Sequence, residues 1–167
     1  MDLLIRDAQL DDAEAILAIL NPIIEVGAYT VLTTPFSVEA EREFILHFPQ
    51  RGIFHVAVCR HKQEIVGFQN IEPFATYNTS AFDHVGVIGT YVSLLCRRQG
   101  IGRSLFNATF EAARCKGYEK LFAYVRADNT AALATYLSQG FRIIGTAQRH
   151  AKINGRYVDE IMIERAL

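Results

Sequence analysis

Apolar and polar positions in the first third of the chain predict one strand and two helices. Leu3–Arg6 is a short β-rich run, which indicates a strand. Residues 11–20 place acidic residues before apolar positions at helical spacing, which favours the start of a helix. We expect a loop or a broken helix over Pro22–Pro35, because proline interrupts helical hydrogen bonding. Residues 37–48 combine a serine cap with a second helical pattern.

The middle of the chain is dominated by β-rich runs. Phe54–Arg60 and Ile65–Ile71 flank a short polar segment and predict a hairpin. Val85–Leu95 reads as a long strand that Gly86 and Gly89 interrupt. Glycines inside a strand indicate a bulge or a close approach of another group to the backbone.

Helices and strands mix in the last part of the chain. Asn154-Gly155 is typical of a type I′ hairpin turn. The patterns predict a helix from Gly100 through Lys116, a strand over Leu121–Val125, a helix over Asp128–Gln139 and strands over Phe141–Thr146 and Tyr157–Ile163. This order favours an α/β fold with a mixed sheet. No repeat, charge run or linker divides the chain, so we expect one domain over residues 1–167.

Composition narrows the functional classes. Hydrophobic residues make up 50% and charged residues 21%, which excludes a disordered or low-complexity protein. Lys and Arg number 17 against 18 for Asp and Glu, so the formal net charge is −1. Such a chain has no global field to attract nucleic acid or an anionic membrane. An anionic ligand must therefore be held by a local cluster.

Cysteine usage and the N-terminus indicate the cellular context. Cys59, Cys96 and Cys115 form no CxxC pair and have no close histidine partner, so we expect neither a disulfide framework nor a metal site. Residues 1–6 lack the build of a secretory signal, and no apolar run approaches the roughly 18 residues of a membrane-spanning helix. We therefore expect a soluble, cytoplasmic protein.

The most informative segment is Arg97–Ser104, which lies between a predicted strand and a predicted helix. Its glycines let the backbone approach a ligand, and the free N–H groups of a helix start bind anions. Arg97, Arg98 and Arg103 add forked donors for phosphate oxygens. The segment predicts a phosphate or pyrophosphate site; the alternative is an ordinary tight turn with solvated arginines.

Two common phosphate-binding motifs do not fit this segment. The chain has no GxxxxGK[ST] sequence, which excludes a P-loop. The dinucleotide motif GxGxxG requires a third glycine where Leu105 stands, and it belongs near the start of a parallel βαβ unit. Dinucleotide binding is therefore disfavoured.

Two motifs resemble the GNAT N-acetyltransferases. Arg97-x-x-Gly100-x-Gly102 is similar to the acyl-CoA loop of that superfamily. Downstream, Asn129-x-x-Ala132-Leu133-x-x-Tyr136-x-x-x-Gly140-Phe141 resembles its second conserved segment. The likeness to phosphinothricin-type acetyltransferases extends over nearly the whole chain, from Ile5–Ala8 to Asn154–Asp159. It implies a GNAT-like fold, with a mixed, mostly antiparallel central sheet flanked by helices on both faces.

The resemblance also implies a cosubstrate, acetyl-CoA, and assigns roles to residues. The pantetheine arm would pair with Tyr91, Val92 and Ser93, and the Val92 N–H would face the thioester oxygen. Asn129 would contact the same arm, and Tyr136 would give a proton to the departing thiolate. The pyrophosphate would lie beside Arg97 and Arg98 on the amides of Gln99, Gly100, Ile101, Gly102, Arg103 and Ser104. The alternatives are that Tyr136 is an ordinary half-buried aromatic residue and that Asn129 caps its helix. A homodimer is implied as well.

One departure from the family pattern concerns the general base. Phosphinothricin-type members carry a carboxylate on the central strand where this chain has Val87. Glu72 and Glu25 are the candidate carboxylates, and His84 has a suitable ordinary pKa near 6.5. Strand alternation places His84 on the opposite face from Val87 unless a bulge resets the phase. Bulk solvent is the remaining alternative.

The acceptor is expected to be a small amine, and phosphinothricin itself is disfavoured because Val87 removes a charge. The residues expected to border the acceptor are Glu25, Tyr29, Phe36, Phe74 and Val87. The aromatic members could equally pack the loops onto the core. The leading hypothesis is an acetyl-CoA-dependent N-acetyltransferase. A non-catalytic acyl-CoA binding or sensing module and a protein-directed acetyltransferase are the alternatives.

Overall fold

The computed structural model covers residues 1–167. Its strands are β1 (Leu3–Asp7), β2 (Ile53–Cys59), β3 (Glu64–Pro73), β4 (Val85–Val92), β5 (Lys120–Arg126), β6 (Arg142–Ile153) and β7 (Arg156–Ala166). Its helices are the 3₁₀ turn η1 (Leu10–Asp12) and the α-helices α1 (Ala13–Val26), α2 (Val38–Leu46), α3 (Ile101–Cys115) and α4 (Thr130–Ser138). None of the α-helices has the length and apolar character that a membrane crossing requires.

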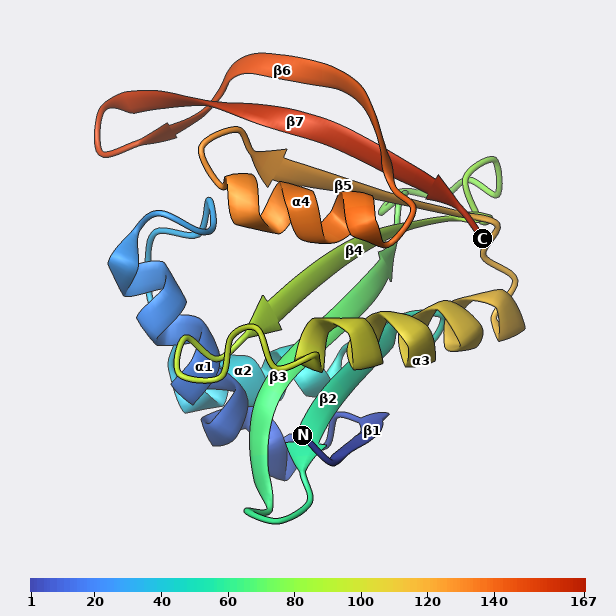
Figure 1. Cartoon of the computed structure of the whole chain (residues 1–167). Coiled ribbons are helices and arrows are strands. Elements are labelled where there is room, and N and C mark those ends of the chain that lie inside the picture. The colour runs from blue at the N-terminus through green and yellow to red at the C-terminus, as the bar shows by residue number, and fades with distance from the viewer.

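All seven strands form one sheet in the order β1-β2-β3-β4-β5-β7-β6. Only β4 and β5 are parallel, and they pair through just three positions, Val85–Val87 with Lys120–Phe122. Beyond these pairs the two strands diverge, and the sheet opens between them (Figure 1). The apolar last strand, β7, lies inside the sheet between β5 and β6. The expected mixed, mostly antiparallel sheet is confirmed.

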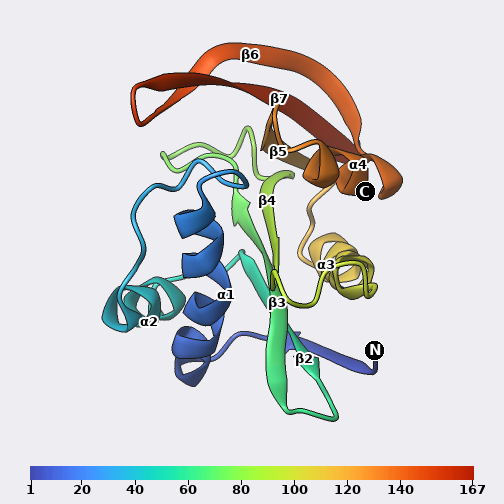
Figure 2. The ribbon, with the colours of Figure 1, turned by 60° about the vertical axis from the view of Figure 1, so that its left-hand side comes forward.

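Helices cover both faces of the sheet. In Figure 2, α1 and α2 lie on one side of β2–β4 and α3 lies on the other. Side chains that alternate along a strand pack against the helices on opposite faces of the sheet. Phe68 of β3 belongs to the core cluster under α1, whereas Ile71 belongs to the cluster under α3. Residues an even number apart on a strand therefore share a face. This alternation decides which side chains can enter the functional site.

The expectation of a loop or a broken helix over Pro22–Pro35 is wrong for Pro22–Val26 and is confirmed from Gly27 onward. Helix α1 continues through Pro22 to Val26 and ends at Gly27, whose φ of 73° lies in the left-handed region. Pro22 cannot donate to the carbonyl four residues earlier, which normally costs a helix about 3 kcal/mol. Ile23 and Ile24 beyond it are buried, so the apolar stripe of the helix continues across the proline and offsets that loss.

The glycines of β4 indicated a bulge or a close approach to the backbone, and the structure shows the close approach. The pairing of β3 with β4 runs without a register shift. A Cβ at Gly86 would lie 2.6 Å from Ile71 Cγ2, and one at Gly89 would lie 2.7 Å from Asn70 Oδ1. The hairpin turn at Asn154-Gly155 is confirmed by φ angles of 49° and 77°.

Candidate active site

The divergence of β4 and β5 exposes an unpaired strand edge in the interior of the sheet. Val85 and Ser93 of this segment exchange backbone hydrogen bonds with the β3 side, through Phe74 N to Val85 O and Ser93 N to Val66 O, both 3.0 Å. In an antiparallel ladder only alternate residues make such bonds. The even-numbered residues therefore point their N–H and C=O groups toward β5. For Thr90 and Val92 these groups face the opening, because β5 pairs with β4 only through Val87.

A cavity of about 1480 Å³ occupies this opening. It extends from the β4–α3 loop, past the diverging strands, to the loop that follows α1 and to β6 and β7. Of the residues predicted from the sequence, those that line it are Tyr29, Glu72, Val87, Tyr91, Val92, Arg97, Arg98, Gly100, Ile101, Gly102, Arg103, Asn129 and Tyr136. The structure thus brings together most of the predicted site.

One end of the cavity is basic and consists of the β4–α3 loop. Arg98 and Gly100 adopt positive φ angles of 60° and 80°, which turn the chain sharply into α3. No acidic residue stands in the first turn of α3. A Cβ at Gly102 would meet nothing within 4 Å, so the helix start is open to a ligand. Unpaired N–H groups and the helix dipole make this end suited to an anion.

Three residues predicted to contribute here do so differently or not at all. Ser104 N donates to Gly100 O at 3.1 Å within the helix, so its amide is not available to a phosphate. Ile101 is 1% exposed and packs in the core, so it can offer only its backbone. Gln99 does not line the cavity. The amides of Ile101, Gly102 and Arg103 remain as donors.

Tyr136 lies where α4 faces the opening. Its ring packs edge-on against Phe106 and Phe141, and its hydroxyl lies 3.0 Å from Thr90 Oγ1. Gln69 Nε2 donates to the same Thr90 oxygen at 2.8 Å. Burial raises the pKa of Tyr136 far above its ordinary value, so the phenol stays protonated. Tyr136 is therefore part of the core and brings a protonated hydroxyl to the cavity wall.

A second contact of Thr90 connects the Tyr136 hydroxyl to Gln69. The Tyr136 hydroxyl donates to Thr90 Oγ1, which also accepts from Gln69 Nε2, because a hydroxyl oxygen can accept two hydrogen bonds. The Tyr136 hydrogen is therefore directed at Thr90 in this structure, and the hydroxyl must rotate to donate into the cavity. Gln69 is fully buried, and its Oε1 has no partner, so the arrangement is maintained at the cost of one unsatisfied acceptor.

The opposite wall of the cavity carries a carboxylate beside Val87. Glu72 of β3 is paired directly with Val87 of β4, so the two side chains share a face of the sheet. Burial raises the pKa of Glu72 above its ordinary value of 4.5. A carboxylate on the neighbouring strand thus stands next to the position that lacks one. His84 lies outside this cavity, on the rim of a smaller pocket.

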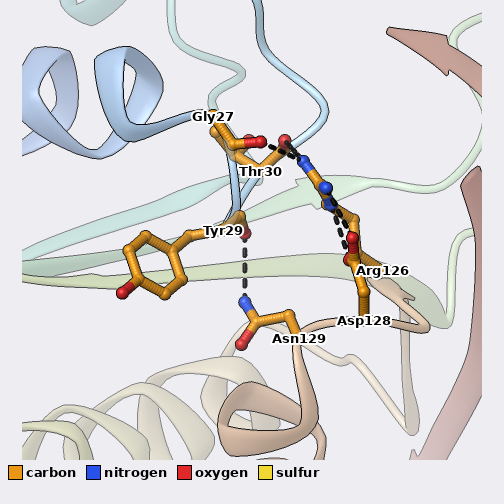
Figure 3. Close-up of polar contacts among 6 residues, drawn as sticks. All are labelled: Gly27, Tyr29, Thr30, Arg126, Asp128 and Asn129. Carbon is orange, nitrogen blue, oxygen red and sulfur yellow. Dashed lines mark hydrogen bonds and ion pairs between the residues drawn. The ribbon is translucent and has the colours of Figure 1, made fainter. Parts of the chain in front are cut away.

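Hydrogen bonds connect the loop after α1 with the end of β5 and the start of α4 at one side of the cavity (Figure 3). Arg126 Nη1 donates to the carbonyl oxygens of Gly27 and Thr30, both at 2.9 Å, and its other nitrogens bind Asp128. Asn129 Nδ2 donates to Tyr29 O at 3.2 Å. These bonds hold the loop over the end of β5.

Asn129 and Tyr29 each make a second contact. Asn129 Oδ1 accepts from Ala132 N at 3.2 Å, so this residue also caps α4. The Tyr29 ring lies 4.1 Å beneath the Arg97 guanidinium. The two loops at opposite ends of the cavity are therefore in contact.

The cavity also contains residues that the sequence patterns missed, including Tyr124, Arg126, His150 and Glu160. The His150 ring stacks on Tyr124 with the ring centroids 5.3 Å apart. His150 lies beyond the predicted end of the strand at Thr146. The position of His150 depends on a bulge between Ala147 and Ala151. For Tyr124 and Arg126, the sequence offered one local signal: they are two residues apart on a predicted strand and so share a face.

Four further predicted residues lie outside the cavity lining. Glu25 is exposed on α1. The backbone of Phe36 is bound by the Asn21 amide, which holds it near the start of α2. Phe74 packs on Phe82 and Phe122 at the smaller pocket. The Ser93 hydroxyl accepts from the Leu95 backbone.

The comparisons with known proteins define the class. The model of the Acetyltransferase (GNAT) family matches residues 23–141, and the chain belongs to this family. It is 27% identical to phosphinothricin N-acetyltransferase of Streptomyces coelicolor over 98% of this chain and 95% of that protein. The expected resemblance to phosphinothricin-type acetyltransferases is confirmed.

Solved structures agree on the fold. Ribosomal-protein-alanine N-acetyltransferase from Brucella melitensis is 29% identical, with a TM-score of 0.90 over 98% of this chain and 99% of that one. An N-acetyltransferase from Staphylococcus aureus Mu50 is 25% identical, with a TM-score of 0.87 over 99% of both chains. A phosphinothricin acetyltransferase from Sinorhizobium meliloti, solved in complex with acetyl-CoA, has a TM-score of 0.89 over 100% of this chain and 89% of that one at 21% identity.

Proposed function

We propose that this chain transfers the acetyl group of acetyl-CoA to the amine of a small molecule. The observation that carries the proposal is the unpaired edge of β4. It lies between an anion-binding helix start at one end and the pair of Tyr136 and Glu72 at the other. An extended amide-containing arm with a phosphate at one end and a reactive group at the other fits this arrangement. The acetyl-CoA complex of the Sinorhizobium meliloti relative supports the same cosubstrate.

Each step of acetyl transfer finds a residue in the cavity. Glu72 accepts the proton of the ammonium, which leaves a neutral amine able to attack. The Val92 N–H donates to the acetyl oxygen as negative charge develops there. Tyr136 donates its proton to the sulfur as the carbon–sulfur bond breaks, and the second proton that the amine nitrogen loses on forming the amide restores the phenol. Tyr91 stacks on Phe68 with centroids 4.8 Å apart, which keeps this part of β4 rigid.

The alternative of a non-catalytic acyl-CoA sensor rests on Val87. Glu72 argues against it, because a carboxylate lines the cavity from the position directly paired with Val87. Peptide N-termini are the second candidate acceptor, favoured by the similarity to ribosomal-protein-alanine N-acetyltransferase. The loop that Arg126 and Asn129 tie across the acceptor wall favours a small amine instead. A peptide with N-terminal alanine that is acetylated faster than any small amine would reverse this order.

The first test concerns Tyr136 and its support by Thr90. Release of CoA thiol should require an added amine, and Tyr136→Phe should lower kcat by about 10–100-fold with little change in the KM for acetyl-CoA. Thr90→Val should lower kcat in the wild-type background and have no further effect in the Tyr136→Phe background. Thr90→Ser, which keeps the hydroxyl, is the matched control. An unchanged kcat in Tyr136→Phe would remove this residue as the acid.

The cytoplasmic location and the homodimer stay predictions. The longest exposed strand edge is that of β6, at the border of the sheet. Light scattering that shows a monomer at working concentration would contradict the dimer.

A further inference from the structure

The acceptor wall is a single face of the sheet. Glu72 is paired with Val87, Val87 with Phe122, and Arg126 with Glu160, and paired residues point to the same side. Phe122 and Arg126 share a face because they are an even number of residues apart. This is the face on which α1 and its following loop lie. Glu72 and Glu160 therefore border the opening from its two sides, one from β3 and one from β7.

Both carboxylates lack a hydrogen-bond partner within the chain. Glu160 is 8% exposed, and its nearest basic partner is His150 Nε2 at 3.9 Å. Glu72 makes no ion pair or side-chain hydrogen bond, and burial raises its pKa. The chain therefore leaves acceptor positions on both carboxylates for a ligand cation, which makes the stronger kind of hydrogen bond with a charged oxygen. Both residues line the cavity, so the partner can come from there.

Apart from Arg97, which lies against Tyr29 where this wall meets the basic end, no Lys or Arg of this wall is free to bind a carboxylate of the ligand. Arg126 lies near Glu160, but its Nε and Nη2 bind Asp128 and its Nη1 binds two carbonyl oxygens. The segments 7–41 and 63–96, which form α1, its following loop, β3 and β4, contain no Lys or Arg. Arg97 lies over the Tyr29 ring and belongs to the basic end.

The Lys and Arg side chains of β5 and β6 are not available to a ligand carboxylate on this wall either. Lys120 and Arg142 pair with Glu164. Arg149 and Lys152 lie over the Tyr157 ring, outside the cavity. His150 is the one imidazole on the wall, and it faces Glu160 and the Tyr124 ring.

We propose that the acceptor is a primary amine without a carboxylate, and that Glu160 together with Glu72 excludes amino acids. The inference rests on the proposed function, because it concerns the acceptor of that transfer. The two carboxylates attract an ammonium group and repel a ligand carboxylate. Tyr29 and Tyr124 give the wall an aromatic lining suited to an apolar tail. Phosphinothricin, an amino acid with a phosphinate group, is disfavoured by the same charges.

Matched pairs of acceptors test the proposal. We would measure kcat/KM with phenethylamine and phenylalanine, with tyramine and tyrosine, and with phenylalaninamide, which has the added bulk but no negative charge. One like-charge pair about 7 Å apart near a protein surface predicts a preference for the amine of about 50-fold. Phenylalaninamide should behave like phenethylamine. Equal turnover of phenylalanine and phenethylamine, or rejection of phenylalaninamide together with phenylalanine, would overturn the proposal.

A charge variant assigns the preference to Glu160. Glu160→Gln, which keeps the size of the side chain, should remove most of the preference for phenethylamine over phenylalanine. Glu111→Gln removes an exposed carboxylate on α3 and should leave the preference unchanged. An unchanged preference in a folded Glu160→Gln enzyme would contradict the role of Glu160.

A binding measurement separates this proposal from the proposed function. Failure to bind acetyl-CoA, or to release CoA thiol with any amine, contradicts the proposed function. Calorimetric titration of the protein with phenethylamine and phenylalanine still tests the acceptor class in that case. Tighter binding of phenethylamine supports the inference, and equal or weaker binding overturns it.

Discussion

The two ends of the cavity use opposite chemistry. The basic end presents backbone N–H groups at the start of α3 together with exposed arginines. The acceptor end works with two shielded carboxylates, Glu72 and Glu160, on a wall where the one arginine, Arg126, is already bonded. A shared cavity can thus hold a polyanion at one end and a cation at the other, because the charges lie on different elements.

The comparison teaches which end depends on individual side chains. At the basic end several amides and arginines act together, so the loss of one arginine leaves most donors in place. At the acceptor end each carboxylate stands alone. Substitutions should therefore affect chemistry most at the acceptor end and cosubstrate affinity most where an opposing charge enters the basic end.

The largest effect is expected for Glu72→Gln. Loss of the base should lower kcat/KM for the amine by about 1000-fold. Because burial raises the pKa of Glu72 and the deprotonated form is active, wild-type kcat/KM should fall as the pH drops through a value above 4.5, and this limb should vanish in the variant. Glu64→Gln, at an exposed position on the same strand, is the control. A pH profile that keeps its acid limb in Glu72→Gln would assign the base to another group.

A smaller effect, on binding rather than chemistry, is expected for Gly102→Glu. The open space around Gly102 lets a carboxylate enter without a clash, beside the amides that would hold the pyrophosphate. Calorimetry should show acetyl-CoA binding weakened by about 100-fold. Gly102→Ala fills the same space without charge and should bind normally. Equal weakening in both variants would point to the backbone instead of the charge.

The smallest effect is expected for the hydrogen bond that joins Asn129, at the start of α4, to Tyr29 in the loop after α1. Ser37→Ala removes only the cap of α2 and should lower the free energy of unfolding by about 1 kcal/mol. Asn129→Ala removes a cap and the bond to Tyr29 O, and should cost about 2 kcal/mol. It should also raise the KM for the amine severalfold, because the loop after α1 loosens. If denaturant titrations and steady-state kinetics show no difference between Ser37→Ala and Asn129→Ala, the bond between Asn129 and Tyr29 does not hold the loop in place.

The basic end could be predicted from the sequence because it is nearly contiguous. Arg97, Gly100 and Gly102 lie within one strand-to-helix turn, and the spacing alone carries the anion site. The second motif around Tyr136 is local as well. The boundaries of most helices and strands were found for the same reason, since caps and turns such as Ser37 and Gly140 act over a few residues.

The acceptor end could not be predicted in this way, because it depends on pairing between distant strands. Glu72 was one of several candidates until the register placed it beside Val87. His150 was missed because β6 continues through a bulge, where Arg149 has a φ of 51° and its N–H is held by Asp159 Oδ1 at 2.7 Å. Helix α1 continues through Pro22 because its next turn is buried. The sequence did not indicate this, because a proline usually interrupts a helix.

The short contact between β4 and β5 has a mechanical consequence. Three residue pairs are the whole ladder between the two parts of the sheet, so side-chain packing, more than backbone pairing, holds β5–β7 against β1–β4. A ligand that spans the opening contacts both parts of the sheet, β1–β4 and β5–β7, and should make their relative position more rigid. Backbone amides of Thr90 and Val92 should then exchange hydrogen slowly with the ligand and rapidly without it, and the change should spread to β5.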